Sequence, residues 1–134
     1  AFLWAQLENL EDIQHKRISI WDTYYGALAE WANEHGIKLP VIPHFATNNA
    51  HMFYLVCRDL DQRNHILEHL KKNGVYSVFH YLSLHNSPFY NAENKLAFLP
   101  NSDYYSDCLL RLPFFYELSN AEMDKIITIV KTSL

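Results

Sequence analysis

The chain has 134 residues, of which 49% are hydrophobic and 15% aromatic. This composition excludes an intrinsically disordered protein, and the length suits one domain with a real core better than two. A formal net charge of −4 and a pI near 6.0 exclude a broad attraction to nucleic acid or to an anionic membrane surface. Cys57 and Cys108 cannot build a disulfide framework, and no apolar run approaches the roughly 18 residues of a spanning helix, so we expect a cytoplasmic protein.

The first predicted element is a long amphipathic helix that begins at Phe2 and stops before Gly36. Its apolar residues recur at steps of three and four and include Leu3, Leu7, Leu10, Ile18, Trp21, Tyr24, Leu28 and Trp31. A helix over 2–34 would approach about 50 Å, which is longer than one small domain can cover. We therefore expect its early turns, which carry Phe2, Leu3, Trp4 and Leu7, to pack against a part of the protein outside this chain. The alternative is a break near Asp22 to Gly26 that gives two helices packed on each other.

The middle of the chain alternates between strand and helix signals. Residues 37–49 contain two prolines and polar residues, which predicts an extended connector. The apolar run 51–58 predicts a buried strand, and Asp59 or Asp61 can cap the helix that follows and ends at Asn73 and Gly74. Residues 75–79 are of the types that suit a second strand, and residues from 82 on suit a loop.

The last third of the chain predicts a short helix, a short strand and a final helix. Asn101 or Ser102 can cap the short helix, and residues 109–115 form an extended run that contains Pro113. Ser119 and Glu122 match a capping box at the start of the last amphipathic helix. The whole order predicts an α+β fold: a long N-terminal helix and a small, mostly antiparallel three-stranded sheet with helices packed on one face.

The candidate site lies where the second predicted strand ends. His80, Tyr81 and His85 follow that strand at the start of the loop, and a rigid element that presents polar side chains at a loop mouth commonly builds a site. Imidazole titrates near neutrality and phenol can donate or accept, so these side chains could act as acid–base or hydrogen-bonding groups. From the residues alone, ordinary core or surface histidines are the simpler interpretation.

Other residue patterns leave two further classes of protein open. His65 and His69 are four apart on a predicted helix, a spacing that suits a metal, although no third ligand is evident. The aromatic residues at the start of the first helix could instead form the interface of a free-standing protein-interaction module without catalysis. Three glycines in the whole chain leave no loop that could cradle a phosphate.

A resemblance to a known family rests on two segments, NNAHMFYLVCRDLDQRNHILEHLKKNGVYSVFHYLSLH and SDCLLRLPFFYELSNAE. Together they resemble the carboxy-terminal small domain of the DegT/DnrJ/EryC1/StrS family of sugar-nucleotide aminotransferases, over essentially the whole chain. The family pattern HYxPLH is met by His80, Tyr81, Leu84 and His85, with Ser83 in place of its usual proline. The LPLF-like run of the family is met by Leu112, Pro113 and Phe114.

The resemblance implies the small domain of a fold-type I, pyridoxal phosphate-dependent enzyme. Such an enzyme moves an amino group from glutamate to a dTDP-linked 4-keto-6-deoxy sugar in surface polysaccharide biosynthesis, such as that of common antigen or lipopolysaccharide, usually as a homodimer. Residues 1–134 would form the C-terminal small domain, and the large domain that carries the cofactor lysine would lie outside them. His80, Tyr81 and His85 would then bind substrate, no residue here would be catalytic or cofactor-binding, and the chain alone is expected to be inactive.

Overall fold

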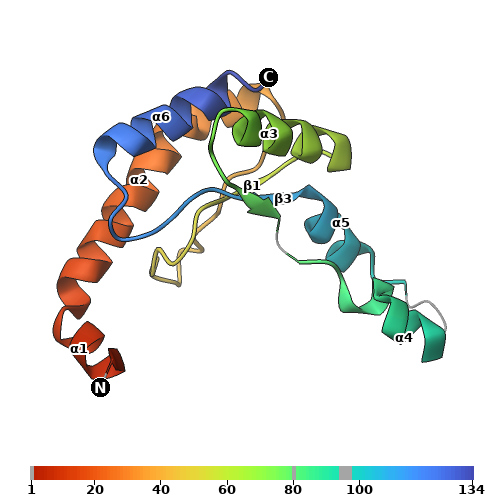
Figure 1. Cartoon of the computed structure of the whole chain (residues 1–134), viewed down its shortest axis with the longest axis horizontal. Helices are drawn as coiled ribbons and strands as arrows, with labels where there is room; N and C mark the ends of the chain where they lie inside the picture. Colours follow the sequence, from red (N-terminus) through yellow and green to blue (C-terminus); the bar gives the residue numbers. More distant parts are fainter. Residues whose placement is uncertain (1, 80, 94–97) are drawn as a thin grey trace.

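A computed structural model describes residues 2–79, 81–93 and 98–134 of the chain (Figure 1). The elements in chain order are α1 (Phe2–Glu8), α2 (Leu10–Glu34), β1 (Tyr54–Val56), α3 (Leu60–Lys72), β2 (Val78–Phe79), the 3-10 turn η1 (Leu84–Asn86), α4 (Pro88–Glu93), α5 (Pro100–Cys108), β3 (Leu109–Arg111) and α6 (Asn120–Lys131). The predicted α+β fold with a small antiparallel sheet is confirmed. In Figure 1 the chain forms an arch, with α3 and α6 along its top and α1 and α4 at its two ends.

The sheet has the strand order β1, β3, β2, so the strand that comes last in the sequence lies in the middle. Leu110 is paired with Leu55 and Phe79, and Arg111 is paired with Tyr54 and Val78, in antiparallel register. Because successive side chains of a strand point to opposite faces, these two rows lie on different sides of the sheet. We call the side of Leu55 and Leu110 the packed face and the side of Tyr54, Val78 and Arg111 the open face.

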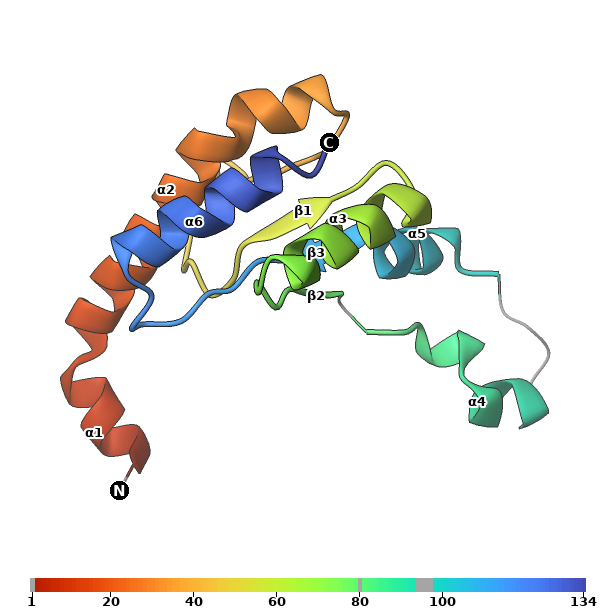
Figure 2. The same cartoon turned by 45° about the horizontal axis from the view of Figure 1, so that its top comes forward.

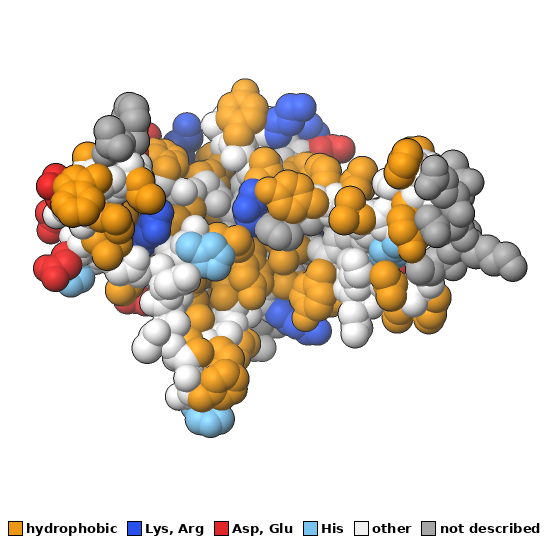
Figure 3. Space-filling model, turned by 90° about the horizontal axis from the view of Figure 1, so that it is seen from below, with side chains coloured by type: hydrophobic (Ala, Val, Ile, Leu, Met, Phe, Trp, Pro, Cys, Tyr) orange, Lys and Arg blue, Asp and Glu red, His pale blue; other side chains and the backbone are white. Residues whose placement is uncertain are grey.

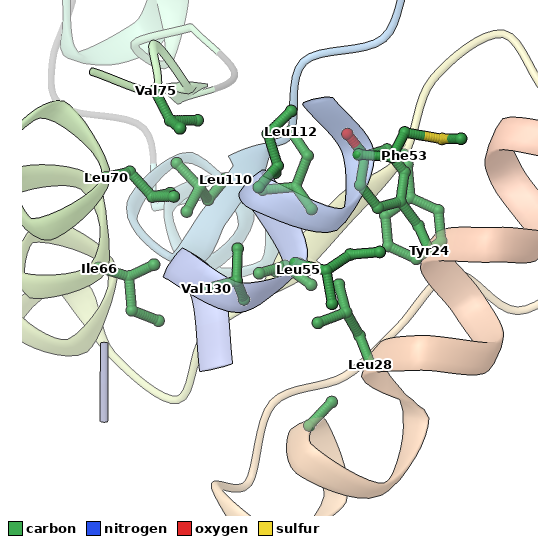
Figure 4. Packing of buried hydrophobic residues seen from close by; sticks show 14 of the residues in the cluster. Tyr24, Leu28, Phe53, Leu55, Ile66, Leu70, Val75, Leu110, Leu112 and Val130 are labelled. Carbon is green, nitrogen blue, oxygen red and sulfur yellow. The ribbon is translucent and has the colours of Figure 1, made fainter. Parts of the chain in front are cut away.

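Helices α2, α3 and α6 cover the packed face, as Figure 2 shows. Figure 4 shows the core between them, with side chains from the sheet, from each of these helices and from the adjoining loops meeting at its centre: Tyr24, Leu28, Phe53, Leu55, Ile66, Leu70, Val75, Leu110, Leu112 and Val130. Leu55 and Leu110 are both 0% exposed. Burying a side chain of this size contributes about 1.5–3 kcal/mol, so the packed face supplies most of the stability of the sheet.

The tyrosine of this core has its polar end satisfied. The Tyr24 hydroxyl donates to the carbonyl oxygen of Pro113 at 3.0 Å, and burial raises the pKa of this phenol well above its usual value. The hydrogen bond ties α2 to the segment that leaves β3.

The first helix is interrupted at Asn9, not near Asp22 to Gly26, because α2 continues through that region without a break. The alternative of two helices divided there is therefore wrong. Burial along α2 begins at Ile20, while the side chains of Leu3, Trp4 and Leu7 are 68%, 71% and 52% exposed, as expected for turns that this domain does not cover. The side chain of Phe2 lies outside the described part of the chain.

Two helix caps were predicted correctly and one was not. Asp59, rather than Asp61, caps α3 by accepting from the Gln62 backbone N–H, and Ser119 forms the predicted capping box with Glu122. Helix α5 begins at Pro100, before both of the caps predicted for it. Proline suits the first helical position, since its fixed φ is helical and its missing N–H has no partner there in any case.

The region predicted as a loop after position 82 contains the turn η1 and the short helix α4. Helix α4 starts at Pro88, and Ser87 Oγ accepts from the backbone N–H of Tyr90 at 3.2 Å. A serine followed by proline is a helix-start signal as well as a loop signal, which explains the error. The predicted strands 51–58, 75–79 and 109–115 are confirmed in place but are shorter, at two or three residues each.

Candidate functional site

Two of the three predicted site residues line one cavity. Tyr81 and His85 both border a hollow of ≈ 540 Å³ between the segment after β2 and helix α5, whereas His80 lies outside the described residues. Most of the surface that lines it is apolar and includes four leucines, and hydroxyl groups are contributed by Tyr81, Ser83, Tyr90, Ser102, Tyr105 and Ser106. A cavity with this lining offers apolar contact surface and several hydrogen-bonding groups, which suits a ligand that carries both apolar and hydroxyl groups.

Tyr81 is held in an unusual conformation at the mouth of this cavity. Its φ is +49°, in the left-handed region, and its side chain is 69% exposed. Ser106 of α5 donates its hydroxyl hydrogen bond to the Tyr81 carbonyl oxygen at 2.7 Å. A non-glycine residue in this region costs on the order of 1–3 kcal/mol, and such residues cluster at functional sites, where the surrounding structure holds them in place. The geometry therefore supports a role for Tyr81 at the site.

His85, which was predicted to lie in the loop after the second strand, is buried. It is 6% exposed, and its Nε2 lies 2.9 Å from Oδ1 of Asp103 on α5. The contact has the distance of an ion pair without the alignment of a hydrogen bond. Asn86 donates to the same carboxylate oxygen at 2.7 Å. The turn η1 thus folds back on α5, where Asp103 lies against both the His85 ring and the Asn86 side chain.

Ser83, which replaces the usual proline of the family pattern, keeps the backbone shape that a proline would impose. Its φ is −59° and its ψ is 128°, values that proline also adopts. Its hydroxyl lies 3.3 Å from Ser102 Oγ and 3.4 Å from Ser102 O. This tether to α5 replaces part of the rigidity that the ring would provide.

The sequence missed the residues of α5 that organise the site. Asp103 and Ser106 hold His85 and the Tyr81 backbone, respectively, yet they lie about twenty residues further along the chain. The sequence signal that could have found them is their spacing of three, which places both on one side of a short helix. That signal becomes informative only once α5 is known to lie against this loop.

The metal-binding hypothesis finds little support in the geometry. His69 Nε2 lies 3.4 Å from Thr132 Oγ1, and His65 is exposed on α3. Within residues 2–79, 81–93 and 98–134, no group of three His, Cys, Asp or Glu side chains is arranged to hold a metal ion.

The two cysteines are poor nucleophiles in this fold. Both are buried thiols, and burial raises the pKa of Cys57 to about 12 and shifts the pKa of Cys108 in the same direction. Among the helices that the structure describes, none has both the length and the apolar character needed to cross a membrane.

Comparison with known proteins decides the family. A model of the DegT/DnrJ/EryC1/StrS aminotransferase family matches residues 1–131. The chain belongs to this family. The aminotransferase TlmJ from Streptoalloteichus hindustanus shares the fold, with a TM-score of 0.84 and 24% identity over 96% of this chain and 34% of that one.

Two further family structures are similar at slightly higher identity. A DegT DnrJ EryC1 StrS aminotransferase from Brucella abortus has a TM-score of 0.78 and 27% identity, over 97% of this chain and 33% of that one. Spr1654 from Streptococcus pneumoniae, a sugar aminotransferase solved in its PLP-form, has a TM-score of 0.83 and 25% identity over the same shares. The chain thus spans about a third of the length of the family structures that it matches.

The family uses pyridoxal phosphate, so we asked whether the described cavity could anchor it. The side chains described around the cavity include no lysine. A lysine amine is what holds this cofactor covalently in enzymes of this kind. The residues present therefore do not fit the covalent anchor of the cofactor.

Proposed function

We propose that this chain is the small domain of a pyridoxal phosphate-dependent aminotransferase that moves an amino group from glutamate to a dTDP-linked 4-keto-6-deoxy sugar. The observation that supports this most strongly is the family match together with the cavity that Tyr81 and His85 border. When bound in such an enzyme, pyridoxal phosphate supplies the chemistry of amino transfer. The side chains of this chain would bind and orient the sugar nucleotide and exclude water from one side of the cleft.

We propose dTDP-4-amino-4,6-dideoxygalactose transaminase, of enterobacterial common antigen biosynthesis, as the specific enzyme. The opening segment AFLWAQLE, which resembles the start of the small domain of that enzyme, supports this choice. The remaining partners would be a large domain that supplies the cofactor lysine and a second subunit in a homodimer. The exposed apolar side chains of Leu3, Trp4 and Leu7 on α1 fit either of these contacts.

In this proposal His80, Tyr81 and His85 bind substrate. The His85 ring, which lies beside Asp103, would hydrogen-bond a hydroxyl or anionic group of the sugar nucleotide or of glutamate. Tyr81, locked by Ser106, would present its phenol at the mouth of the same cavity. None of these groups needs to exchange a proton with the reacting carbon, since the proton shuttle of such enzymes is the cofactor lysine.

The test compares two histidines in the full-length enzyme. A hydrogen bond to a charged group is worth about 1.5–3 kcal/mol, so His85→Ala should lower kcat/KM by roughly ten-fold to over a hundred-fold. His65→Ala, at an exposed position of α3, should leave kcat/KM near the wild-type value. Amino transfer and thermal unfolding are measured for both variants.

Because His85 is buried beside Asp103, its truncation could also loosen η1. His85→Gln, which keeps more of the side-chain volume, separates the two effects. A loss of kcat/KM in His85→Gln with an unchanged melting temperature supports substrate binding. Near-normal kinetics in His85→Ala, or a loss that follows the melting temperature across both variants, would remove His85 from the site.

A further inference from the structure

Arg111 is a cation at the centre of the open face, and no ion pair or hydrogen bond within the described part of the chain satisfies its Nε. It lies on the middle strand β3 and is half-buried. Its Nε is shielded from solvent and has no hydrogen-bond partner among the described residues. No ion pair in the described part of the chain includes it. Its guanidinium carbon lies 6.0 Å from the centre of the Tyr81 ring.

A second arginine, Arg63, shows how this fold satisfies the Nε donor of a buried arginine. Arg63 on α3 is 8% exposed, donates from Nε to the Asp107 carbonyl oxygen at 2.8 Å, and lies 5.0 Å from the centre of the Phe79 ring. Arg111 has the aromatic neighbour without the acceptor. The chain has 15 acidic residues, so a shortage of carboxylates does not explain the difference. A shielded donor without a partner is unfavourable, and a bound anion would satisfy the donor of Arg111.

The surroundings of Arg111 suit a small anion. It lines a hollow of ≈ 250 Å³ together with His51, Met52, Tyr76, Val78 and Phe114. The walls combine polar groups with apolar side chains, and the partial burial of Arg111 lowers the local dielectric constant, which strengthens the attraction between its guanidinium and an oxyanion. His51 Nδ1 lies 2.8 Å from Asn49 Oδ1, and this hydrogen bond orients the His51 ring in the wall of the hollow. The volume is below that of pockets which enclose a drug-sized ligand, so it fits an acid group rather than a whole nucleotide.

The open face connects this hollow to the larger cavity. Tyr81 borders the larger cavity, and its ring lies beside Arg111. Figure 3 views the molecule from the side opposite α3 and α6, where hydrophobic side chains cover much of the surface and few Lys or Arg side chains stand among them. A ligand in the cavity with an acid group attached could therefore reach Arg111 past Tyr81.

We infer that Arg111 anchors an anion subsite that binds the carboxylate or phosphate oxygens of a molecule reacting in the neighbouring cavity. The planar fork of a guanidinium matches either group with two parallel hydrogen bonds. The identity of the ligand rests on the proposed function, which offers two sources of this chemistry: a carboxylate of glutamate or the diphosphate of the sugar nucleotide. The anion subsite itself rests on the geometry of Arg111 alone.

The test measures binding to the full-length protein by calorimetry, with glutamate and dTDP as separate probes. The variants are Arg111→Gln, which removes the charge, Arg111→Lys, which keeps the charge without the fork, and Arg58→Gln as a matched control on the surface. Arg58 pairs with Asp59 in solvent and borders neither cavity. Arg111→Gln should raise the Kd of one probe by roughly ten- to a hundred-fold and change the other by less than two-fold.

The probe that responds identifies the source of the anion. Arg111→Lys should recover only part of the affinity, and Arg58→Gln should bind both probes like the wild type. Unchanged Kd values for both probes in Arg111→Gln would overturn the inference, as would losses for both that accompany a lower melting temperature. If the wild-type protein binds a probe through Arg111 and yet transfers no amino group, the proposed function fails while the anion subsite stands.

Discussion

Leu110 and Arg111 are neighbours on the central strand, and their side chains lie on opposite faces of the sheet. Leu110 is 0% exposed among the side chains of three helices, whereas Arg111 is half-buried with a shielded donor that nothing in the described chain accepts. The packed face is filled by side chains of this chain, whereas the open face carries a shielded Nε donor without a partner in the described residues. The comparison separates the residues that make the fold stable from those that the fold holds ready for a ligand.

The largest expected effect on the free energy of unfolding comes from truncating a buried side chain on the packed face. Leu110→Ala should lower the free energy of unfolding by about 2–5 kcal/mol, since it removes a fully buried side chain and leaves a cavity. Val78→Ala, at a position on the open face that is 48% exposed, should lower it by less than about 1 kcal/mol. Denaturant unfolding of both variants measures the difference. Equal losses would mean that the two faces do not differ as described.

Arg63 and Arg111 allow the two faces to be compared at residues of the same type. Arg63→Met should lower the free energy of unfolding by about 1–3 kcal/mol, because it leaves the Asp107 carbonyl without its donor. Arg111→Met makes the same change in net charge and breaks no hydrogen bond of the described structure, so stability should stay the same or rise. Thermal and denaturant unfolding would detect the contrast. A loss in Arg111→Met as large as that in Arg63→Met would show that Arg111 serves structure.

A smaller effect is expected from the hydroxyl that joins α2 to the end of β3. Tyr24→Phe removes the donor to the Pro113 carbonyl and should lower the free energy of unfolding by about 1 kcal/mol. The adjacent Tyr25 is 40% exposed and stacks on Trp21, and its hydroxyl makes no hydrogen bond in the described structure. Tyr25→Phe therefore serves as the control and should change stability little. If both variants unfold alike, the buried hydrogen bond contributes nothing measurable.

The smallest expected effect is on the pH dependence of stability. The Gln62 backbone N–H lowers the pKa of Asp59, and the Ser119 hydroxyl lowers the pKa of Glu122, from ordinary values of 3.8 and 4.5. Groups with a lowered folded pKa stabilise the protein above their ordinary pKa, and this stabilisation is lost as the pH falls through the folded value. Asp59→Asn with Glu122→Gln should therefore lose less stability than the wild type between about pH 5 and pH 2. An identical pH dependence would contradict these shifts.

The sequence predicted elements whose signals are local. The Asp59 cap, the capping box of Ser119 and the three strand positions depend on residues within a few places of one another, and the structure confirms them. Helix α4 was missed because Ser87 followed by Pro88 starts a helix as readily as it starts a loop.

The sequence grouped the candidate site residues and missed the side chains of α5 that lie against them. Tyr81 and His85 do border one cavity, as their place after a strand indicated. The burial of His85 and the partners Asp103 and Ser106 depend on how α5 folds against the loop, which no short pattern encodes. Arg111 was not singled out, because an arginine in a short extended run becomes unusual only when its missing partner is visible in three dimensions.

The central claim is that the open face and the cavity beside it form one wall of an amino transfer site. Hydrogen–deuterium exchange of the full-length protein, with and without bound sugar nucleotide, tests this most directly. The account predicts slower exchange in peptides that cover residues 81–90 and 100–111, with no change in α6 behind the packed face. Bound sugar nucleotide that leaves residues 81–90 and 100–111 unchanged while it protects other parts of the protein would contradict the claim.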